Sequence, residues 1–223
     1  MVEIVEKNEF IEIEYSGRIK DGEIFDSTIL EEAKKLNPDV KEVKPYILCI
    51  GQNMVLPAID DFLTGKEVGK PYLLELPAEK AFGKRDKNLV KTVPISVFRQ
   101  QDISPQQGMV FSFDNMLGRI SAVSGGRIIV DFNNPLAGKD VIYDIKIKRK
   151  ITDINEKIKT LMQAFYRAEF DFSVENKKLI IKTEKGIEKF IMLFAEKFKE
   201  ILGLDLEVKE KPAEEPNQPS QKG

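Results

Sequence analysis

This 223-residue sequence contains no histidine, no tryptophan and a single cysteine, Cys49. Without histidine the chain cannot form a Ser-His-Asp triad or a Cys-His dyad, and it has no imidazole to act as a general base. One cysteine permits neither an intramolecular disulfide nor a zinc site built from several thiolates. We therefore expect any enzymatic reaction to need little acid–base chemistry, and the sparse use of cysteine favours a reducing, cytoplasmic compartment.

Other common signatures are also missing. No apolar run approaches the roughly 18–20 residues that a membrane-spanning helix needs. The first ten residues are acidic and alternating, unlike a signal peptide. The formal net charge of −2 gives no general attraction to nucleic acid. Because EF-hand spacing and a Gly-rich phosphate loop are absent as well, we expect no metal ion, no cofactor, no nucleic acid and no membrane among the ligands.

What is present in the first half is typical of short strands and helices. Residues 10–19 alternate apolar and polar side chains, which predicts a strand, and the pair Asp21-Gly22 predicts a turn into a second strand. Residues 28–36 have helical composition. Between Met54 and Leu63 the apolar residues follow the spacing of a short helix, with Pro57 in its first turn.

The composition and pattern of the sequence then change twice. Residues 86–132 hold several short strands and turn signals, which predicts a small all-β unit of its own. Residues 153–210 read as α-β-β-α-β, an order that can bury one face of a small sheet under two helices. The apolar residues from Ile187 to Leu202 follow the spacing of a single long helix, which would be the second of the two. From 211 to 223 the chain is rich in Pro, Glu, Gln and Ser, which predicts a disordered tail.

Over residues 10–148 the chain resembles the FKBP family of peptidyl-prolyl isomerases, in particular its long prokaryotic SlyD-like branch. The motifs that carry the resemblance occur in the family's order and spacing: Tyr15-Ser16-Gly17, Asp21-Gly22-Glu23-Ile24-Phe25-Asp26-Ser27, Ile50-Gly51, Val55-Leu56, Gly69-Lys70, Ala81-Phe82-Gly83 and Asn133-Asn134-Pro135-Leu136-Ala137-Gly138. The last motif resembles the return from an insert-in-flap domain, which implies that residues 86–132 are inserted and that the first domain comprises residues 1–85 and 133–152. The resemblance implies an α+β fold in which an antiparallel sheet wraps a short helix, and a cofactor-free isomerase acting on proline-containing or unfolded polypeptides.

The resemblance also implies a site. Its catalytic group would be Tyr15, Asp26, Phe82 and Tyr143, and its substrate-binding group Phe25, Tyr46, Val55, Leu56, Ile59, Leu136 and Ala137. Ile59 and Phe82 stand where the family often has tryptophan and tyrosine, and Asn134 where it often has histidine. The residues themselves leave alternatives open, because the aromatic and aliphatic positions are equally typical of a core. Asp26 could orient a substrate or hold Tyr15, but it could also be a turn or capping carboxylate.

Residues 86–132 carry more apolar side chains than a unit of that size can bury. We expect a surface that binds unfolded chains, formed by Val97, Phe98, Met109, Phe111, Met116 and Leu117. The alternative is a self-sufficient core with no exposed patch. The resemblance implies that such a domain captures a substrate and delivers it to the pocket.

The C-terminal unit offers no chemistry, although it could form a homodimer or touch a substrate. Two rivals to the isomerase remain. The chain could be a non-catalytic chaperone or scaffold that keeps the fold, with Ile59 and Phe82 marking a decayed site. It could also dock on a ribosome or nucleic acid through the basic run from Lys146 to Lys150, which the net charge disfavours.

Overall fold

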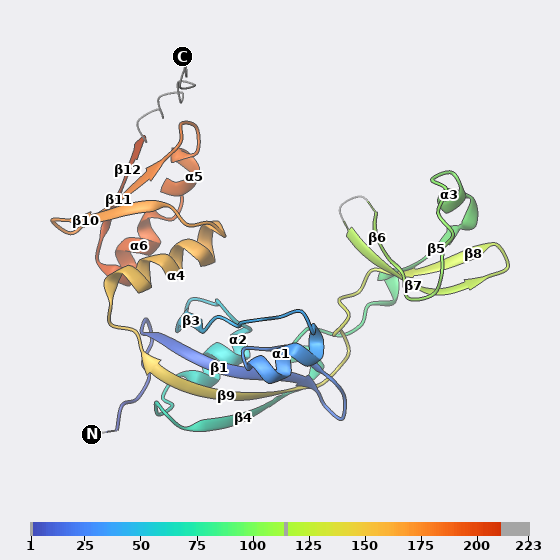
Figure 1. Cartoon of the computed structure of the whole chain (residues 1–223), viewed down its shortest axis with the longest axis horizontal. Coiled ribbons are helices and arrows are strands. Elements are labelled where there is room, and N and C mark those ends of the chain that lie inside the picture. Colours follow the sequence, from blue (N-terminus) through green and yellow to red (C-terminus); the bar gives the residue numbers. More distant parts are fainter. Residues whose placement is uncertain (1, 114–115, 211–223) are drawn as a thin grey trace, which may run out of the picture.

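The computed structural model describes residues 2–113 and 116–210 and contains three separate sheets (Figure 1). The first is a five-stranded antiparallel sheet with the order β2-β1-β9-β4, in which β3 also pairs with β1. Its elements are β1 (Phe10–Ile19), β2 (Ile24–Ser27), α1 (Leu30–Leu36), β3 (Tyr46–Cys49), α2 (Pro57–Leu63), β4 (Pro71–Leu76), the 3-10 turn η1 (Ala78–Lys80) and β9 (Val141–Lys150). The predicted α+β class is confirmed.

The long pair β1 and β9 forms the centre of this sheet and brings residues far apart in the sequence onto one face. Tyr15 lies opposite Ile145, and Gly17 lies opposite Tyr143. Since side chains two residues apart in a strand share a face, the odd-numbered residues from 13 to 19 and from 141 to 147 face the same way, up to a bulge between Glu12 and Ile13. The helix α2 covers this face, and Ile59 and Leu63 of α2 are buried against it. The predicted arrangement, a sheet wrapped on a short helix, follows from this pairing.

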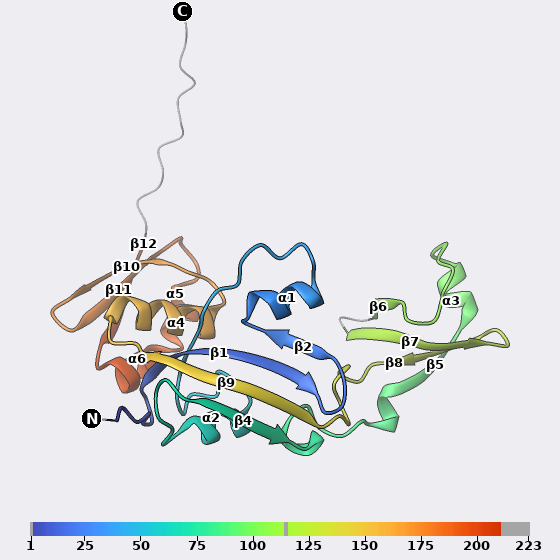
Figure 2. The same ribbon diagram turned by 60° about the horizontal axis from the view of Figure 1, so that its bottom comes forward.

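The second sheet lies between β4 and β9 in the sequence and has the strand order β5-β8-β7-β6. Its elements are the 3-10 turn η2 (Lys87–Leu89), β5 (Val90–Pro94), α3 (Ile95–Arg99), β6 (Val110–Phe113), β7 (Met116–Ser124) and β8 (Arg127–Asp131). The expectation of an all-β unit missed α3, a single turn that packs Phe98 onto Ile120, Ile128 and Val130 of the sheet. Figure 2 shows this inserted unit at one end of the first sheet, with the C-terminal unit at the other end.

The third sheet belongs to the C-terminal unit and has the order β10-β11-β12, in which β11 and β12 are parallel. Its elements are α4 (Ile154–Tyr166), β10 (Asp171–Glu175), β11 (Lys178–Thr183), α5 (Glu188–Met192), α6 (Ala195–Leu202) and β12 (Asp205–Glu210). Ile158, Leu161 and Met162 of α4 are fully buried, as their spacing predicts. The same core includes Phe10 and Cys49 of the first sheet, so the C-terminal unit packs directly on β1 and β3.

The single long helix expected after Gly186 is instead two short ones, α5 and α6. The backbone carbonyl of Ile191 accepts a 2.9 Å hydrogen bond from the Tyr166 hydroxyl, and the Phe194 N–H bonds the same carbonyl at 3.3 Å. This i+3 bond tightens the chain and ends α5, because Tyr166 and the backbone share the carbonyl that a continuous helix would use. The predicted tail, 211–223, lies outside the described residues.

Candidate functional site

A cavity of about 450 Å³ opens between the first sheet and α2. Ten of the eleven residues predicted for the catalytic and substrate-binding groups line it: Tyr15, Phe25, Asp26, Tyr46, Val55, Leu56, Ile59, Phe82, Leu136 and Tyr143. Ala137 does not line the cavity. It lies in the loop before β9, where its N–H donates to the Asn134 carbonyl at 2.9 Å, and this turn leaves Leu136 as the loop's contribution to the cavity.

The rings of the cavity contact one another edge to face. Phe25 is perpendicular to both Phe82 and Tyr143, with ring centroids 5.7 and 5.8 Å apart. Tyr15 is perpendicular to Tyr46 at 5.9 Å. This geometry is the favoured one for aromatic pairs, because the positive edge of one ring meets the negative face of the next. The rings therefore support each other and form rigid walls around the cavity.

Gly17 makes this arrangement possible. A Cβ at position 17 would lie 2.9 Å from ring carbons of both Phe25 and Tyr143, closer than real Cβ contacts allow. The missing side chain thus lets the two rings lie over β1. The motif Tyr15-Ser16-Gly17 therefore has a physical reason. Tyr15 supplies one ring of the cavity wall, and Gly17 leaves the space that the rings of Phe25 and Tyr143 occupy.

Asp26 holds Tyr15 in the free protein. The Tyr15 hydroxyl donates a 2.7 Å hydrogen bond to Oδ2 of Asp26. The alternative, a capping carboxylate, is not what the structure contains, because α1 has no side-chain cap and Ser27 accepts the hydrogen bond from the Ile29 N–H at 3.0 Å. Thr28 fixes the backbone of Tyr15, accepting from its N–H through Oγ1 at 2.8 Å.

The three phenols of the cavity differ in what they bind. Tyr15 bonds Asp26, and the Tyr46 hydroxyl donates to the Met54 carbonyl at 2.9 Å. The Tyr143 hydroxyl makes no hydrogen bond with any residue that the structure describes. Burial raises the pKa of Tyr143 to about 12 and raises the pKa of Tyr15 and Tyr46 as well, and the Asp26 charge acts in the same direction on all three. All three phenols are therefore neutral at neutral pH.

A buried carboxylate fixes the segment that leads from β3 to α2. Asp60 of α2 is 4 % exposed and accepts hydrogen bonds from the N–H groups of Gly51 at 2.8 Å and Asn53 at 2.9 Å. Gly51 and Asn53 both have positive φ, at 82° and 54°, so the segment turns sharply here. Met54 follows directly, and its position in the cavity wall depends on this anchored turn.

Three lining residues were missed by the sequence reasoning: Ile13, Met54 and Ile145. A signal for two of them was available, because Ile13 precedes Tyr15 by two residues and Ile145 follows Tyr143 by two. In a strand, such neighbours share a face. Met54 had no comparable signal, since it precedes α2 and reaches the cavity through the turn that Asp60 anchors.

Two side chains, Asn133 and Arg85, hold the connection to the inserted unit. Asn133 accepts from the Asp86 N–H through Oδ1 at 2.8 Å, and its Nδ2 donates to the Asp86 carbonyl at 2.9 Å and to Oδ1 of Asp131 at 2.7 Å. The outgoing and returning segments are thus tied together next to the cavity. Partial burial opposes ionisation of Asp131, but bonds from Asn133 and the Arg85 guanidinium hold the pKa of this carboxyl below its usual value.

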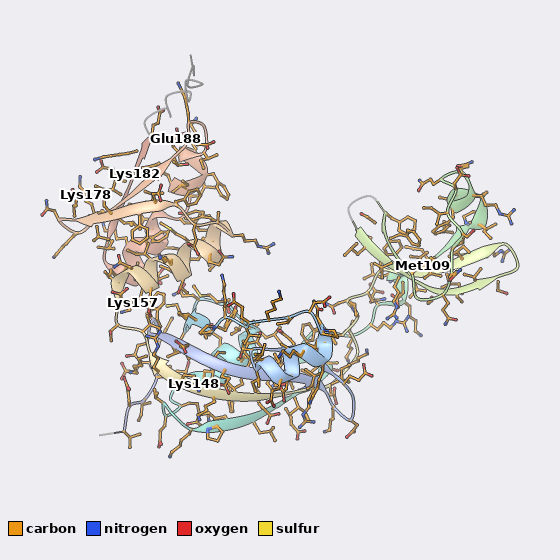
Figure 3. All side chains as sticks on the ribbon, in the orientation of Figure 1. Met109, Lys148, Lys157, Lys178, Lys182 and Glu188 are labelled. Carbon is orange, nitrogen blue, oxygen red and sulfur yellow. The ribbon has the colours of Figure 1, made fainter. Side chains whose placement is uncertain are left out.

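The inserted unit does expose apolar side chains. Of the six residues predicted to form a binding surface, Val97, Met109, Met116 and Leu117 are exposed, and Leu117 most of all at 71 %. The prediction was wrong for Phe98, which is 2 % exposed, and Phe111 packs edge to face against it with ring centroids 5.6 Å apart. Both rings belong to the small core of the unit, together with Ile120, Ile128 and Val130. Figure 3 shows Met109 on this unit, among the side chains of its sheet.

Within residues 2–113 and 116–210, no group of three or more acidic or cysteine side chains is placed to hold a metal ion. Cys49 is fully buried in the core shared with the C-terminal unit, and burial raises the pKa of its thiol to about 12. A thiol of this kind stays protonated and is not a nucleophile at neutral pH. None of the described helices is both long enough and apolar enough to cross a membrane.

Comparison with protein-family models gives two matches. The model described as FKBP-type peptidyl-prolyl cis-trans isomerase matches residues 2–113, and the model described as FKBP26, IF domain, matches residues 91–136. Both matches end before the C-terminal unit begins. The second covers most of the inserted sheet and the loop that returns from it.

Curated proteins give the same result. The chain is 29 % identical to a short-type peptidyl-prolyl cis-trans isomerase of Methanocaldococcus jannaschii over 150 residues, which is 66 % of this chain and 95 % of that protein. It is 30 % identical to the FKBP-type isomerase SlyD of Treponema pallidum, over 64 % of this chain and 77 % of that protein. It is 28 % identical to SlyD of Haemophilus influenzae, over 64 % of this chain and 70 % of that protein.

Proposed function

This chain belongs to the FKBP-type peptidyl-prolyl cis-trans isomerase family, and from that premise we propose that the cavity lined by Tyr15, Phe25 and Tyr143 rotates Xaa-Pro bonds. The family membership makes the protein a peptidyl-prolyl isomerase. What we add is the assignment of the reaction to this cavity and of separate roles to its residues. Its volume of about 450 Å³ is in the range of small-ligand sites and exceeds what a proline ring alone needs.

Rotation about the Xaa-Pro bond needs an environment rather than a reacting group. The bond has partial double-bond character, and its rotation barrier is about 18–20 kcal/mol. The planar amide is polar and is stabilised by water, whereas the twisted amide has lost resonance and is less polar. A dry wall of rings and aliphatic side chains therefore stabilises the twisted form relative to the planar one. A 10⁴-fold acceleration corresponds to only about 5.5 kcal/mol of such preference.

The hydrogen bonds of the cavity support a division of roles. Tyr15 is already bonded to Asp26, so the pair holds the rim between β1 and β2 in place. Tyr143 carries a phenol whose hydroxyl is unbonded among the described residues, and burial keeps this phenol protonated. We assign to Tyr143 the donation of a hydrogen bond to a substrate carbonyl. Phe82, which has no hydroxyl, contributes only its ring.

The observation that carries this proposal is the convergence on one cavity of ten residues that the resemblance had implied. The test is the cis/trans exchange rate of a short Xaa-Pro tetrapeptide, measured by magnetisation-transfer NMR, which needs no coupling protease. We expect acceleration by the wild-type protein and a lower rate for Phe82→Ala. If the purified protein leaves the exchange at its spontaneous rate, the cavity is not a catalytic site and the non-catalytic scaffold becomes the better hypothesis.

We also propose that the inserted unit binds unfolded polypeptides and thereby gives the protein chaperone activity. The support is its exposed apolar side chains, because Val110 at 57 %, Met116 at 49 % and Leu117 at 71 % cannot be buried by so small a core. Unfolded chains offer complementary apolar segments, and methionine adapts its shape to many of them. We keep the proposed domain boundaries, 86–132 for this unit and 1–85 with 133–152 for the isomerase domain, because Asn133 ties Asp86 to Asp131 where the two meet.

For the C-terminal unit, proposed as 153–210, we retain homodimer formation as its function. The support is an apolar patch around α5, where Ile187, Phe190, Met192 and Leu193 are exposed by 38, 48, 44 and 75 %. Four neighbouring large side chains of this kind favour a protein partner, and a second copy of the chain is the simplest one. Sedimentation of the wild type and of Phe190→Ser/Leu193→Ser tests this, since a dimer through the patch becomes a monomer in the variant.

A further inference from the structure

A second hollow lies directly behind the cavity. It has a volume of about 630 Å³ and is enclosed by β3, by the turn after it and by the outer part of α4. Tyr46 and Met54 line both the cavity and this hollow, so the two spaces share one wall. The C-terminal unit, for which the family comparison gives no function, therefore forms one side of a space that adjoins the isomerase site.

The edge of β3 presents unused backbone groups to this hollow. Within the described chain β3 pairs with β1 alone. Ile50 exchanges hydrogen bonds with the β1 side, through Asn8 and Glu9, while the Cys49 N–H points the other way and donates to Sδ of Met54 at 3.2 Å. Because backbone direction alternates along a strand, the N–H and C=O of Ile47 share the outward direction of Cys49. Ile47 lines the hollow, and its N–H makes no hydrogen bond with any described residue.

The α4 side of the hollow carries an excess of positive charge, although Ala164 and Phe165 also line it. Lys159, Gln163 and Arg167 come from α4 and its C-terminal cap, and Glu169 follows. Lys159 and Arg167 are exposed and form no ion pair with the described part of the chain, so two cations face one carboxylate. An extended polypeptide can satisfy the backbone groups of a strand edge, and an acidic side chain can satisfy the cations.

We propose that this hollow binds the continuation of the polypeptide whose proline occupies the cavity, and that it prefers an acidic residue in that continuation. The proposal rests on the proposed function of the cavity. The substrate segment would add to the free edge of β3 at Ile47, with its carboxylate near Lys159 and Arg167. An extended chain advances about 3.3–3.6 Å per residue, so a few residues suffice to pass the wall of Tyr46 and Met54. The C-terminal unit then contributes to substrate choice.

The test compares peptides of two lengths in the same exchange assay. One is an Xaa-Pro tetrapeptide, and the others are decapeptides around the same Xaa-Pro pair that carry glutamate or glutamine at successive positions on either side. With the full-length wild-type protein we expect kcat/KM to be about five- to tenfold higher for the best glutamate decapeptide than for its glutamine twin. The advantage disappears near 1 M salt, where the screening length falls to about 3 Å.

Charge substitutions on the C-terminal unit test whether the glutamate advantage arises in the hollow. Lys159→Gln/Arg167→Gln removes the glutamate advantage and leaves the tetrapeptide rate unchanged. The control Lys182→Gln/Lys185→Gln makes the same charge change at exposed positions of the same unit that do not line the hollow, and it keeps the advantage. Figure 3 shows Lys182 on the sheet of the C-terminal unit, away from the junction at Lys157. N-methylation of the extension's amides, which removes donors for the Ile47 carbonyl, lowers the gain as well.

Equal rates for glutamate and glutamine decapeptides, or an advantage that survives Lys159→Gln/Arg167→Gln, overturn the proposal while the tetrapeptide rate still supports the isomerase site. If the tetrapeptide is not accelerated, the proposed function of the cavity fails. Binding of peptide to the hollow is then measured separately, by the fluorescence anisotropy of a labelled glutamate decapeptide. Binding that weakens about fivefold in the charge variant alone supports the hollow, and binding that is identical in the wild type and both variants excludes it.

Discussion

The hydroxyl of Tyr15 donates a 2.7 Å hydrogen bond to Oδ2 of Asp26, and this bond joins β1 to β2 at the rim of the cavity. If the pair acts as one unit that holds the wall, removing either partner has the same consequence. We expect Tyr15→Phe and Asp26→Ala each to lower kcat/KM for a proline tetrapeptide by about tenfold, and the double variant to lower it no further. Multiplied losses in the double variant would mean that Asp26 contacts the substrate independently of Tyr15.

The second prediction distinguishes the Tyr46 hydroxyl, which stabilises the fold, from the Tyr143 hydroxyl, which is available to the substrate. Tyr143→Phe removes a hydroxyl without a partner among the described residues, so we expect kcat/KM to fall about tenfold with no loss of stability. Tyr46→Phe removes a donor to the Met54 carbonyl, so we expect it to lower the free energy of unfolding by about 1 kcal/mol. Urea denaturation and the exchange assay on both variants give the comparison. A Tyr143→Phe enzyme of unchanged rate would remove the proposed donor.

The third prediction concerns the turn behind the wall. Asp60→Ala leaves the N–H groups of Gly51 and Asn53 without their acceptor in a buried place. We expect the free energy of unfolding to fall by roughly 2–4 kcal/mol, measured by urea denaturation. Asp61→Ala is the matched control, because Asp61 is the next residue of α2 and is exposed, and we expect a change within about 0.5 kcal/mol. Similar losses in the two variants would show that the anchor contributes little.

These residues also show how far the sequence could lead. The family resemblance carried by the ordered motifs was sufficient to place ten lining residues, and the alternation of β1 and β9 could have added Ile13 and Ile145. Asp60 could not be found, because its partners are backbone groups of a turn with two positive φ values, and no side-chain pattern encodes them. The predicted exposure of Phe98 was wrong for a related reason. A single turn of helix after Pro94 decides which way it points, and composition does not reveal this.

The contact between the C-terminal unit and the first sheet was equally hidden. Phe10 and Cys49 lie in β1 and β3, and the core of the first sheet alone accounts for the alternating pattern of these strands. Both side chains are nevertheless buried in the other core, which α4 and α6 complete. The stacking of Phe165 on Phe194, with centroids 4.9 Å apart, and the bond from Tyr166 to Ile191 break the expected long helix. Both effects arise from tertiary contacts, which override the helical spacing of the sequence.

The fourth prediction uses the pKa of Tyr143. Its folded-state pKa is about 12 against an ordinary value of 10.0, so the unfolded chain loses this proton first as the pH rises. Stability from this group is complete below pH 10 and is lost as the pH rises towards 12. We expect wild type to lose roughly 2–3 kcal/mol more than Tyr143→Phe over that interval, measured by urea denaturation at each pH. Between about pH 6 and 9 the isomerisation rate should be flat, since no histidine or ionising phenol titrates there.

The fifth prediction tests whether exposed apolar side chains promote refolding only when they lie on the inserted unit. Val110 and Leu117 are on the inserted sheet, whereas Leu73 is 55 % exposed on β4 of the isomerase sheet. We expect Val110→Ser/Leu117→Ser to slow the catalysed refolding of a proline-limited protein by about tenfold, because the apolar area that would hold the unfolded chain is lost. The tetrapeptide, which is too short to need this surface, should be turned over at the wild-type rate.

Leu73→Ser is the control for that comparison, because it removes an apolar side chain of similar exposure from β4, which lies outside the inserted unit and contributes no residue to the cavity lining. If capture by the inserted unit limits refolding, Leu73→Ser refolds the protein substrate as fast as wild type. If the wild type and both variants refold it equally, the exposed residues of the inserted unit serve no client. Because the tetrapeptide rate is measured on the same preparations, a loss confined to the protein substrate can be attributed to capture and not to the chemistry of the pocket.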